Sequence, residues 1–528
     1  MSVATLVVTT ITMVGLALAR TGGHLAYVID DGGIHLSIAR NFGLHFTWGV
    51  VPHHFQSASS SPLWTVLLAI VARVTPRTMF EYAPLVLSTA AATWLLVLLG
   101  REQTIFRRRF SAVLGAIVAV PMVIVLLFLP TLAMTGMEHV LHCMLVVQAV
   151  ALCTRAARAG VQPARTAYIV LALAAATRYE TLFVAAGLGV ALLLTRRWRH
   201  QIGPVLLTAA AAATPIVLMG LISIGFGQQF FPNSILAKSA LGSHSNLRSV
   251  SILHGIRQLD ADHAVFALFL LAVAYLVAAG FGRVRRSLVP AIVLVVATAL
   301  HSLFADYHWF ERYEAYLIAI GLFFLLGAVG EIARQRTWYV AAGSALLLAM
   351  TIAPAHTKWD LVFETPLASK DTYLQRYQAG KFLAHYYDNQ PIATSELGYI
   401  SYFHTGPITD VLGLGDHEVL AAREAGRADA SYFGGLMQRR GVHVVVVYWL
   451  SLFSTTPQTW TLVGQWVLDV KNISAFDSRI QFWAPNKSDV EPILRELETW
   501  NKKLPKGAHT EVNPFLPYKS ALPKFACC

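Results

Sequence analysis

The chain has 528 residues, of which 55% are hydrophobic and only 13% charged, a balance that excludes an ordinary soluble protein. The net charge of +12 could suggest a nucleic-acid partner, but the arginines cluster in short loops between apolar segments, as in membrane proteins. We therefore expect a polytopic membrane protein that is embedded in the lipid bilayer and binds no nucleic acid.

Eleven apolar segments are candidates for membrane-spanning helices. They lie at about 3–19, 82–100, 111–130, 138–154, 165–177, 181–195, 204–225, 263–281, 288–304, 313–330 and 338–355. Arginine-rich loops alternate with arginine-poor loops if the N-terminus is cytoplasmic. Ser61–Val74 must then be a juxtamembrane helix on the outer face. This topology predicts a multi-pass protein of the plasma (inner) membrane with an extracytoplasmic C-terminus.

The composition changes at about residue 356, where polar residues become more frequent and short β-rich runs appear. Strands are predicted at Pro391–Glu396, Ile408–Leu414, Val442–Tyr448, Trp460–Val470 and Arg479–Trp483, and helices at Asp371–Tyr387 and Glu418–Arg440. We therefore expect two domains. Residues 1–355 would form the transmembrane domain, with a first outer loop over 20–81, and residues 356–528 an extracytoplasmic α/β domain. The end of the chain, Pro505–Cys528, is expected to be poorly ordered.

Two adjacent carboxylates, Asp30 and Asp31, directly follow the first apolar segment. Charges at the edge of a membrane are costly, which favours a functional role. The alternative is that they cap the helix predicted at Ile34–Asn41, although a cap needs only one of them. The predicted topology places further polar residues on the same face: Glu138, Arg178, Glu180, Asn233, Lys238, His308 and Arg312.

These acids and bases could transfer a group that is activated by a membrane lipid phosphate. The sequence has no Walker A motif, dinucleotide fingerprint, HExxH or CxxC pair, which argues against nucleotide-driven or redox chemistry. Asp30 or Asp31 could act as the general base on a hydroxyl, and cations would stabilise the leaving phosphate. The candidate cations are Arg178, Arg312 and Lys238.

Each of these side chains also has a structural alternative. Arg178 could pair with Glu180, Arg312 with Glu311 or Glu314, and Glu138 with His139 or His142, and Lys238 could be an ordinary loop lysine.

Five motifs follow one another along the membrane part: Asp30-Asp31-Gly32-Gly33-Ile34, Ser61-Pro62-Leu63-Trp64-Thr65, Thr135-Gly136-Met137-Glu138, Arg178-Tyr179-Glu180, and Pro232-Asn233 through Lys238. Their order resembles that of GT-C membrane glycosyltransferases, in particular the branch related to mycobacterial terminal arabinofuranosyltransferases. The resemblance is weaker after residue 356, where Leu397-Gly398-Tyr399-Ile400 and Asp410-Val411-Leu412-Gly413-Leu414 carry it. The chain departs from the family at Gly32-Gly33, where a small and then an aromatic residue are usual, and at Tyr179, where proline is usual.

The resemblance implies a GT-C fold of about eleven transmembrane helices with an exported α/β domain. It implies an inverting transferase that moves arabinofuranose or a similar sugar from a polyprenyl-phosphate donor to a cell-envelope glycan acceptor. The first-loop aspartates would be catalytic, with Asp30 slightly preferred to Asp31. Other residues would form the substrate pocket: Glu138, Glu180, Asn233, His308 and Trp64. Trp64 would also shape the lipid entrance. No metal site is predicted and no cofactor is required, although a divalent cation is left open.

Two other functions remain open at this point. A transporter would move a lipid-linked sugar without chemistry, although such proteins favour inverted repeats and broken helices in mid-membrane. A receptor or scaffold would bind wall glycan through its exported domain, and Asp30 and Asp31 would then be dispensable.

Overall fold

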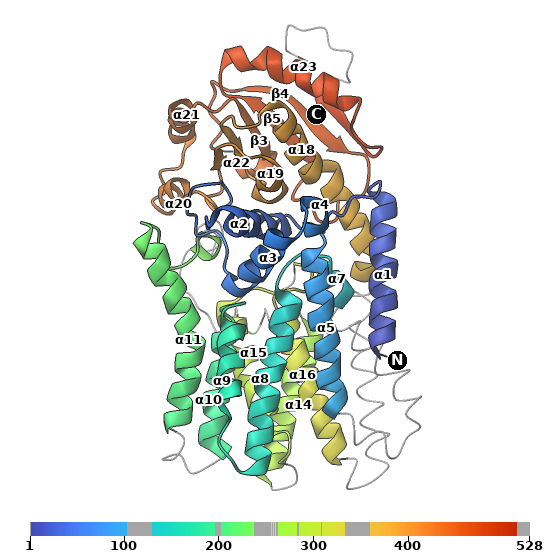
Figure 1. The fold of residues 1–528 in the computed structure, drawn as a ribbon, viewed down its shortest axis with the longest axis vertical. Coiled ribbons are helices and arrows are strands. Elements are labelled where there is room, and N and C mark those ends of the chain that lie inside the picture. The colour runs from blue at the N-terminus through green and yellow to red at the C-terminus, as the bar shows by residue number, and fades with distance from the viewer. Residues whose placement is uncertain are drawn as a thin grey trace.

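In this computed structural model, the structure describes residues 2–102, 129–195, 202–236, 262–281, 285–307, 309–332, 360–452 and 454–514, together with Gly255, Arg257 and Leu259. A bundle of long helices forms one half of the molecule and a C-terminal α/β part forms the other (Figure 1). The helices of the first outer loop lie between these two halves (Figure 1). They are α2 (Asp31–His45), α3 (Pro62–Val74) and α4 (Arg77–Phe80).

The bundle is built from ten described helices: α1 (Ser2–Arg20), α5 (Ala83–Glu102), α7 (Leu129–Ala133), α8 (His139–Ala159), α9 (Arg165–Ala175), α10 (Thr181–Thr195), α11 (Ile202–Gly225), α14 (His263–Gly280), α15 (Leu288–Phe304) and α16 (Ala315–Ile332). By length and composition, five described helices could cross a membrane, namely α1, α4 continued into α5, α8, α11 and α14. The apolar helices α3, α9, α10, α15 and α16 are shorter. The predicted spans at 111–130 and 338–355 lie outside the described residues, except where α7 begins, so the number eleven stays a prediction.

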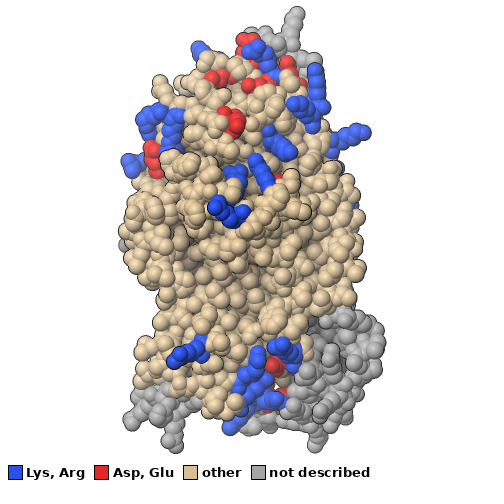
Figure 2. Space-filling model, viewed as in Figure 1, with Lys and Arg blue, Asp and Glu red and all other residues tan. Residues whose placement is uncertain are grey.

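The outer surface of the bundle is apolar, as a lipid-facing surface should be. On α11, for example, Leu206 and Leu221 expose 63% and 58% of their surface. On the face shown in Figure 2, a broad band without charged residues crosses the bundle, and lysines and arginines gather at both ends. Because exposed leucine in water is unfavourable and charge in hydrocarbon is costly, this surface fits a membrane environment.

The C-terminal part contains a six-stranded mixed sheet in the order β2-β1-β3-β5-β4-β6. The strands are β1 (Ile392–Thr394), β2 (Ile408–Asp410), β3 (Val444–Tyr448), β4 (Thr461–Leu468), β5 (Arg479–Ala484) and β6 (Ala508–Val512). Strands β1, β2 and β3 run parallel, and the remaining pairs are antiparallel. Along β3, Val446 and Val447 face two different apolar clusters because side chains alternate across a strand.

Helices cover both faces of this sheet. Helical residues 360–372 continue through a π-helical turn, Tyr373–Tyr377, into α18 (Gln378–Tyr386). The other helices are α19 (Leu397–Phe403), α20 (His417–Glu424), α21 (Ala430–Arg439), α22 (Trp449–Leu452) and α23 (Val490–Asn501), the last preceded by a 3-10 turn, Lys487–Asp489. Phe382 of α18 and Leu497 of α23 belong to the cluster on one face, and Phe433 of α21 to the cluster on the other.

Most of the local predictions for this part are confirmed, and two are wrong. Each of the five predicted strands contains an observed strand. The single helix expected at Glu418–Arg440 is two helices, α20 and α21, because Gly426 turns the chain with a φ of +65°. Part of the segment expected to be poorly ordered forms β6, which pairs with β4.

Helix α19, which the sequence pattern did not predict, joins the C-terminal part to the first outer loop. It packs against α2 at Gly33 and Gly398, where the two backbones approach closely. A Cβ atom on Gly33 would lie 2.5 Å from the carbonyl carbon of Gly398. Only glycine allows this approach. The contact gives a physical reason for glycine at position 33.

Candidate active site

Asp31 is the first residue of α2, at the boundary between the bundle and the C-terminal part. Its Oδ2 lies 2.9 Å from Nη1 of Arg312, and 35% of its side chain is exposed. Arg312 is 3% exposed and follows a turn in which Trp309, Phe310 and Glu311 all have positive φ values, between 51° and 61°. This left-handed turn lies three residues before α16 and orients Arg312 toward Asp31. Among the described residues, Arg312 therefore pairs with Asp31, a predicted catalytic residue, and not with Glu311 or Glu314 as in the structural alternative.

Asp30 makes different contacts from Asp31. Its carboxylate does not cap α2. Instead it accepts hydrogen bonds from the first N–H groups of α19, at 2.5 Å from Gly398 N and 3.1 Å from Tyr399 N. Burial raises the pKa of the Asp30 carboxyl, while Arg376 and these backbone groups act in the opposite direction. Both oxygens of Asp30 are thus committed to holding α19 against the first outer loop.

Arg178 lies between α9 and α10. Its Nη1 donates to Glu138 at 2.8 Å and its Nη2 to Glu180 at 2.5 Å. Glu138 is fully buried at the start of α8, and the Arg178 side chain is only 12% exposed. One guanidinium therefore balances two carboxylates. The predicted pairing with Glu180 is present, and Glu138 pairs with Arg178 rather than with His142.

A tyrosine and a histidine connect these two groups into one site. The ring of Tyr313 lies between the two guanidiniums, 4.8 Å from the central carbon of Arg312 and 5.7 Å from that of Arg178. His35 stands one helical turn after Asp31, and its Nε2 is 3.5 Å from Glu138. The structure thus brings together the predicted residues Asp31, Glu138, Arg178, Glu180 and Arg312.

The charge of this site differs from the cation-rich cradle expected from the sequence. Burial lowers the pKa of His35, which favours the neutral imidazole. The three carboxylates and two guanidiniums then leave these described groups with a net charge of −1. One cationic donor still lacks a partner, because Nε of Arg312 is buried without a hydrogen-bond partner among the described residues.

The remaining predicted residues have different positions. Asn233 is fully buried; its backbone N–H bonds to Ser57 O at 2.8 Å, and neither atom of its side-chain amide has a partner within the described ranges. Trp64 is fully buried in an apolar cluster with residues of α2 such as Leu36, and its role at a lipid entrance stays a prediction. Lys238 and His308 lie outside the described residues.

Sequence reasoning missed His35 and Tyr313. Both had a local signal, since His35 follows Asp31 at the i+4 spacing of one helix face and Tyr313 directly follows Arg312.

A second buried ion pair, Arg376–Glu396, had no such signal. It lies at 2.7 Å beside the start of α19. Burial raises the pKa of Glu396 to about 8, against the opposing effect of Arg376.

One group of carboxylates could hold a metal ion. In the part of the chain that the structure describes, Asp262, Glu311 and Glu314 have ligand oxygens within 4.8 Å of one another. Asp262 also caps α14 by accepting from Ala264 N at 2.9 Å, so one of its oxygens is already used. Oxygen ligands of this kind suit Mg²⁺ or Ca²⁺.

Comparisons with known proteins address the fold. No curated protein matches the sequence. Residues 368–485 match the model of a family described as "Domain of unknown function (DUF8728)". Among solved structures, ArnT from Cupriavidus metallidurans in the apo state is similar over 92% of this chain and 98% of its own, with 15% identity and a TM-score of 0.50. The same protein bound to undecaprenyl phosphate gives 14% identity, the same coverage and a TM-score of 0.52.

A more distant likeness is the archaeal oligosaccharyltransferase AglB from Archaeoglobus fulgidus. It has 11% identity, a TM-score of 0.47, and coverage of 92% of this chain and 74% of that one. The mycobacterial branch suggested by the motifs stays a prediction. The similarity to ArnT along almost the whole of both chains shows that this protein shares the fold of ArnT.

Proposed function

We propose that this protein is a glycosyltransferase that moves a sugar, arabinofuranose or a similar one, from a polyprenyl-phosphate donor to a cell-envelope glycan. The observation that carries the proposal is the partly exposed carboxylate of Asp31 beside the buried guanidinium of Arg312. Two further findings support it: the fold shared with ArnT, which has been solved with undecaprenyl phosphate, and the order of the motifs.

Asp31 is the general base in this proposal. Both oxygens of Asp30 accept N–H groups of α19, whereas 35% of the Asp31 side chain is open to an incoming acceptor. A carboxylate in this position can take the proton of the attacking hydroxyl. The slight preference for Asp30 drawn from the sequence is therefore reversed, and Asp30 becomes the residue that holds α19 in place.

The transfer is a single displacement. The acceptor oxygen attacks the anomeric carbon of the sugar and gives its proton to Asp31. The bond from that carbon to the donor phosphate breaks, and the phosphate oxygen keeps the electron pair. Arg312 stabilises this anion through its unpartnered Nε–H, since a buried guanidinium donor interacts strongly with phosphate. Lys238 remains the second proposed cation, on sequence grounds alone.

Arg178 has a changed role. Its guanidinium is already balanced by Glu138 and Glu180, so we assign it to positioning: it fixes these two carboxylates and stacks on Tyr313. Glu138, Glu180 and Asn233 stay proposed pocket residues. The buried amide of Asn233 could hydrogen-bond a sugar hydroxyl, which would satisfy its donors and acceptor.

The proposed orientation places the N-terminus in the cytoplasm and residues 356–528 outside, where they help to hold the acceptor. The arginine-rich loops support it, because the basic residues Arg101, Arg158 and Arg285 belong to loops and helix ends at the bundle end far from the C-terminal part (Figures 1 and 2). The domain boundary near residue 356 belongs to the same proposal.

The test uses the purified full chain in lipid nanodiscs with a panel of polyprenyl-phosphate sugars and a glycan acceptor. Mass spectrometry would follow the released polyprenyl phosphate and the elongated glycan. We expect turnover with at least one donor and a loss of about 10²–10⁴-fold in Asp31→Asn, with donor binding retained. The matched control is Asp388→Asn, which changes an exposed carboxylate that is not part of the candidate active site.

Two outcomes would contradict the proposal. Undiminished turnover in Asp31→Asn would remove this residue from catalysis. Binding of a donor that is carried across the bilayer but never cleaved, with any acceptor, would favour the transporter.

A further inference from the structure

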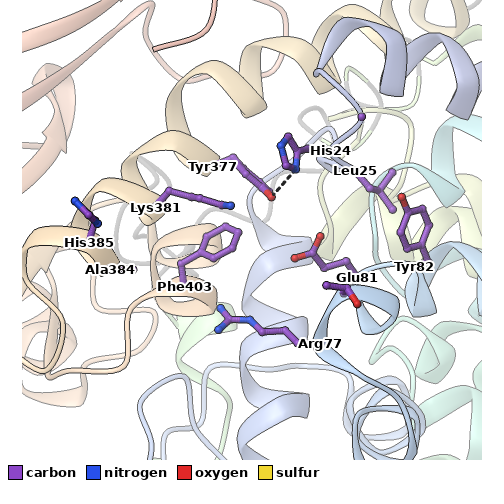
Figure 3. A pocket seen from close by; sticks show the side chains of 12 residues that line it. His24, Leu25, Arg77, Glu81, Tyr82, Tyr377, Lys381, Ala384, His385 and Phe403 are labelled. Atoms are coloured by element: carbon purple, nitrogen blue, oxygen red, sulfur yellow. Dashed lines mark hydrogen bonds between the residues drawn. The ribbon is translucent and has the colours of Figure 1, made fainter. Parts of the chain in front are cut away.

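A cavity lies between the first outer loop and the C-terminal part. Its volume is about 610 Å³, and its lining combines charged, aromatic and small residues (Figure 3). These are Gly23, His24, Leu25, Arg77, Thr78, Glu81, Tyr82, Tyr377, Lys381, Ala384, His385 and Phe403. None of them belongs to the candidate active site.

Helix α19 separates this cavity from the candidate active site. Asp30 holds the first residues of α19, Gly398 and Tyr399, while Phe403 at the last residue lines the cavity. A helix of seven residues is roughly 10 Å long. The cavity is therefore a distinct site, connected to the first by one rigid element.

The electrostatic character of the cavity is cationic. Arg77 and Lys381 lie on either side of the Phe403 ring, each 5.5 Å from its centre, and Glu81 faces them across the cavity (Figure 3). Among the described residues, neither cation forms an ion pair with a carboxylate. The two cations and one acid leave a charge of +1 beside an open volume, which suits an anion.

Arg77 has a structural role as well. Its Nη2 donates to the carbonyl oxygen of Tyr402 at 2.9 Å, and a cation at the end of α19 stabilises that helix. This role explains Arg77 but not Lys381, which lies on α18 with its Nζ 5.5 Å from the ring centres of both Tyr377 and Phe403.

The position of the cavity relative to the apolar surface of the bundle indicates the kind of anion that it would bind. Gly23 and His24 follow the end of α1, and Glu81 precedes α5. Both helices present apolar side chains outward: Ile11 of α1 is 65% exposed and Val86 of α5 is 62% exposed. The cavity therefore opens where a hydrocarbon-facing surface ends, which is the level of lipid headgroups.

We propose that this cavity binds the phosphate of a net-anionic lipid headgroup, with Lys381 and Arg77 as its cationic contacts. The proposal concerns lipid recognition at the membrane surface and does not depend on the transfer reaction.

Native mass spectrometry of the detergent-purified full chain tests it. The protein would be mixed with phosphatidylglycerol, with phosphatidylcholine, or with inorganic phosphate. We expect phosphatidylglycerol to bind more tightly than phosphatidylcholine, and Lys381→Gln and Arg77→Gln each to weaken it about fivefold, the effect of one cation at a membrane surface. The matched controls are Lys502→Gln and Arg73→Gln, which remove exposed charges outside the cavity and should leave binding unchanged.

Three results would overturn the proposal. They are equal binding of the two lipids, equal effects of cavity and control variants, and binding of inorganic phosphate without phosphatidylglycerol. Because Lys381 makes no hydrogen bond to α19, Lys381→Gln keeps the test valid even if Arg77→Gln disturbs that helix.

Discussion

The substitution Gly33→Ala would test the close contact between α2 and α19. A Cβ atom at position 33 would lie 2.5 Å from the carbonyl carbon and 2.7 Å from the next nitrogen, Tyr399 N, of the opposing backbone. Both are backbone atoms, so no side chain can move aside. To relieve this steric clash, the two helices would have to separate by about 1 Å, because ordinary van der Waals contacts begin near 3.4 Å.

Such a separation would also break the hydrogen bonds that Asp30 accepts from Gly398 and Tyr399. Overpacking costs about 1–3 kcal/mol and the lost buried hydrogen bonds about 1–3 kcal/mol. Alanine in a helix recovers up to about 1 kcal/mol relative to glycine. We therefore expect Gly33→Ala to weaken this contact by about 1–5 kcal/mol.

Hydrogen–deuterium exchange of the peptide containing residues 397–403 is the assay, because the N–H groups held by Asp30 belong to it. A loss in this range should raise their exchange rate about fivefold or more, where exchange reports local opening. The control is Gly15→Ala in α1, where an added Cβ meets nothing within 4 Å. If Gly33→Ala exchanged at the wild-type rate, the close approach of the two helices would be refuted.

Three further predictions concern buried charges. Asp30→Asn should loosen α19 by about 1–3 kcal/mol, because an amide oxygen replaces only one of two acceptors, and unchanged exchange over residues 397–403 would contradict this. Burial raises the pKa of Glu396 to about 8, so the protonated carboxyl stabilises the folded protein. This contribution to the free energy of unfolding is lost as pH rises through that value. The thermal midpoint of the wild type should fall between pH 6 and pH 9, and that of Glu396→Gln, which cannot ionise, should fall less; equal falls would count against the assignment. Arg178→Met should cost about 3–5 kcal/mol, because it leaves Glu138 and Glu180 buried without a counter-ion. Changing both acids to Gln in that background should restore most of the thermal midpoint, and no recovery would show that the pairing is not the cause.

Local patterns in the sequence were sufficient for most of the described secondary structure and for the general class of protein. The apolar runs marked the bundle helices, and the alternation of valines marked β3. The sequence also identified the tandem acids and the arginines of the candidate site. A charged residue beside an apolar helix is costly in a membrane, which makes it a candidate for function. Helix α19 was missed because seven residues are too few to show a helical period.

The roles of these residues depended on contacts between distant parts of the chain. Asp31 meets Arg312 across 281 residues, and Asp30 meets Gly398 across 368. Neighbouring, chemically identical carboxylates therefore have different partners: Asp31 contacts a guanidinium and Asp30 the start of a helix. The sequence by itself determined which charged residues this protein carries and that they border a membrane. Only the tertiary structure decided which of them are paired, buried or accessible, because pairing and burial are properties of three-dimensional neighbours and not of position along the chain.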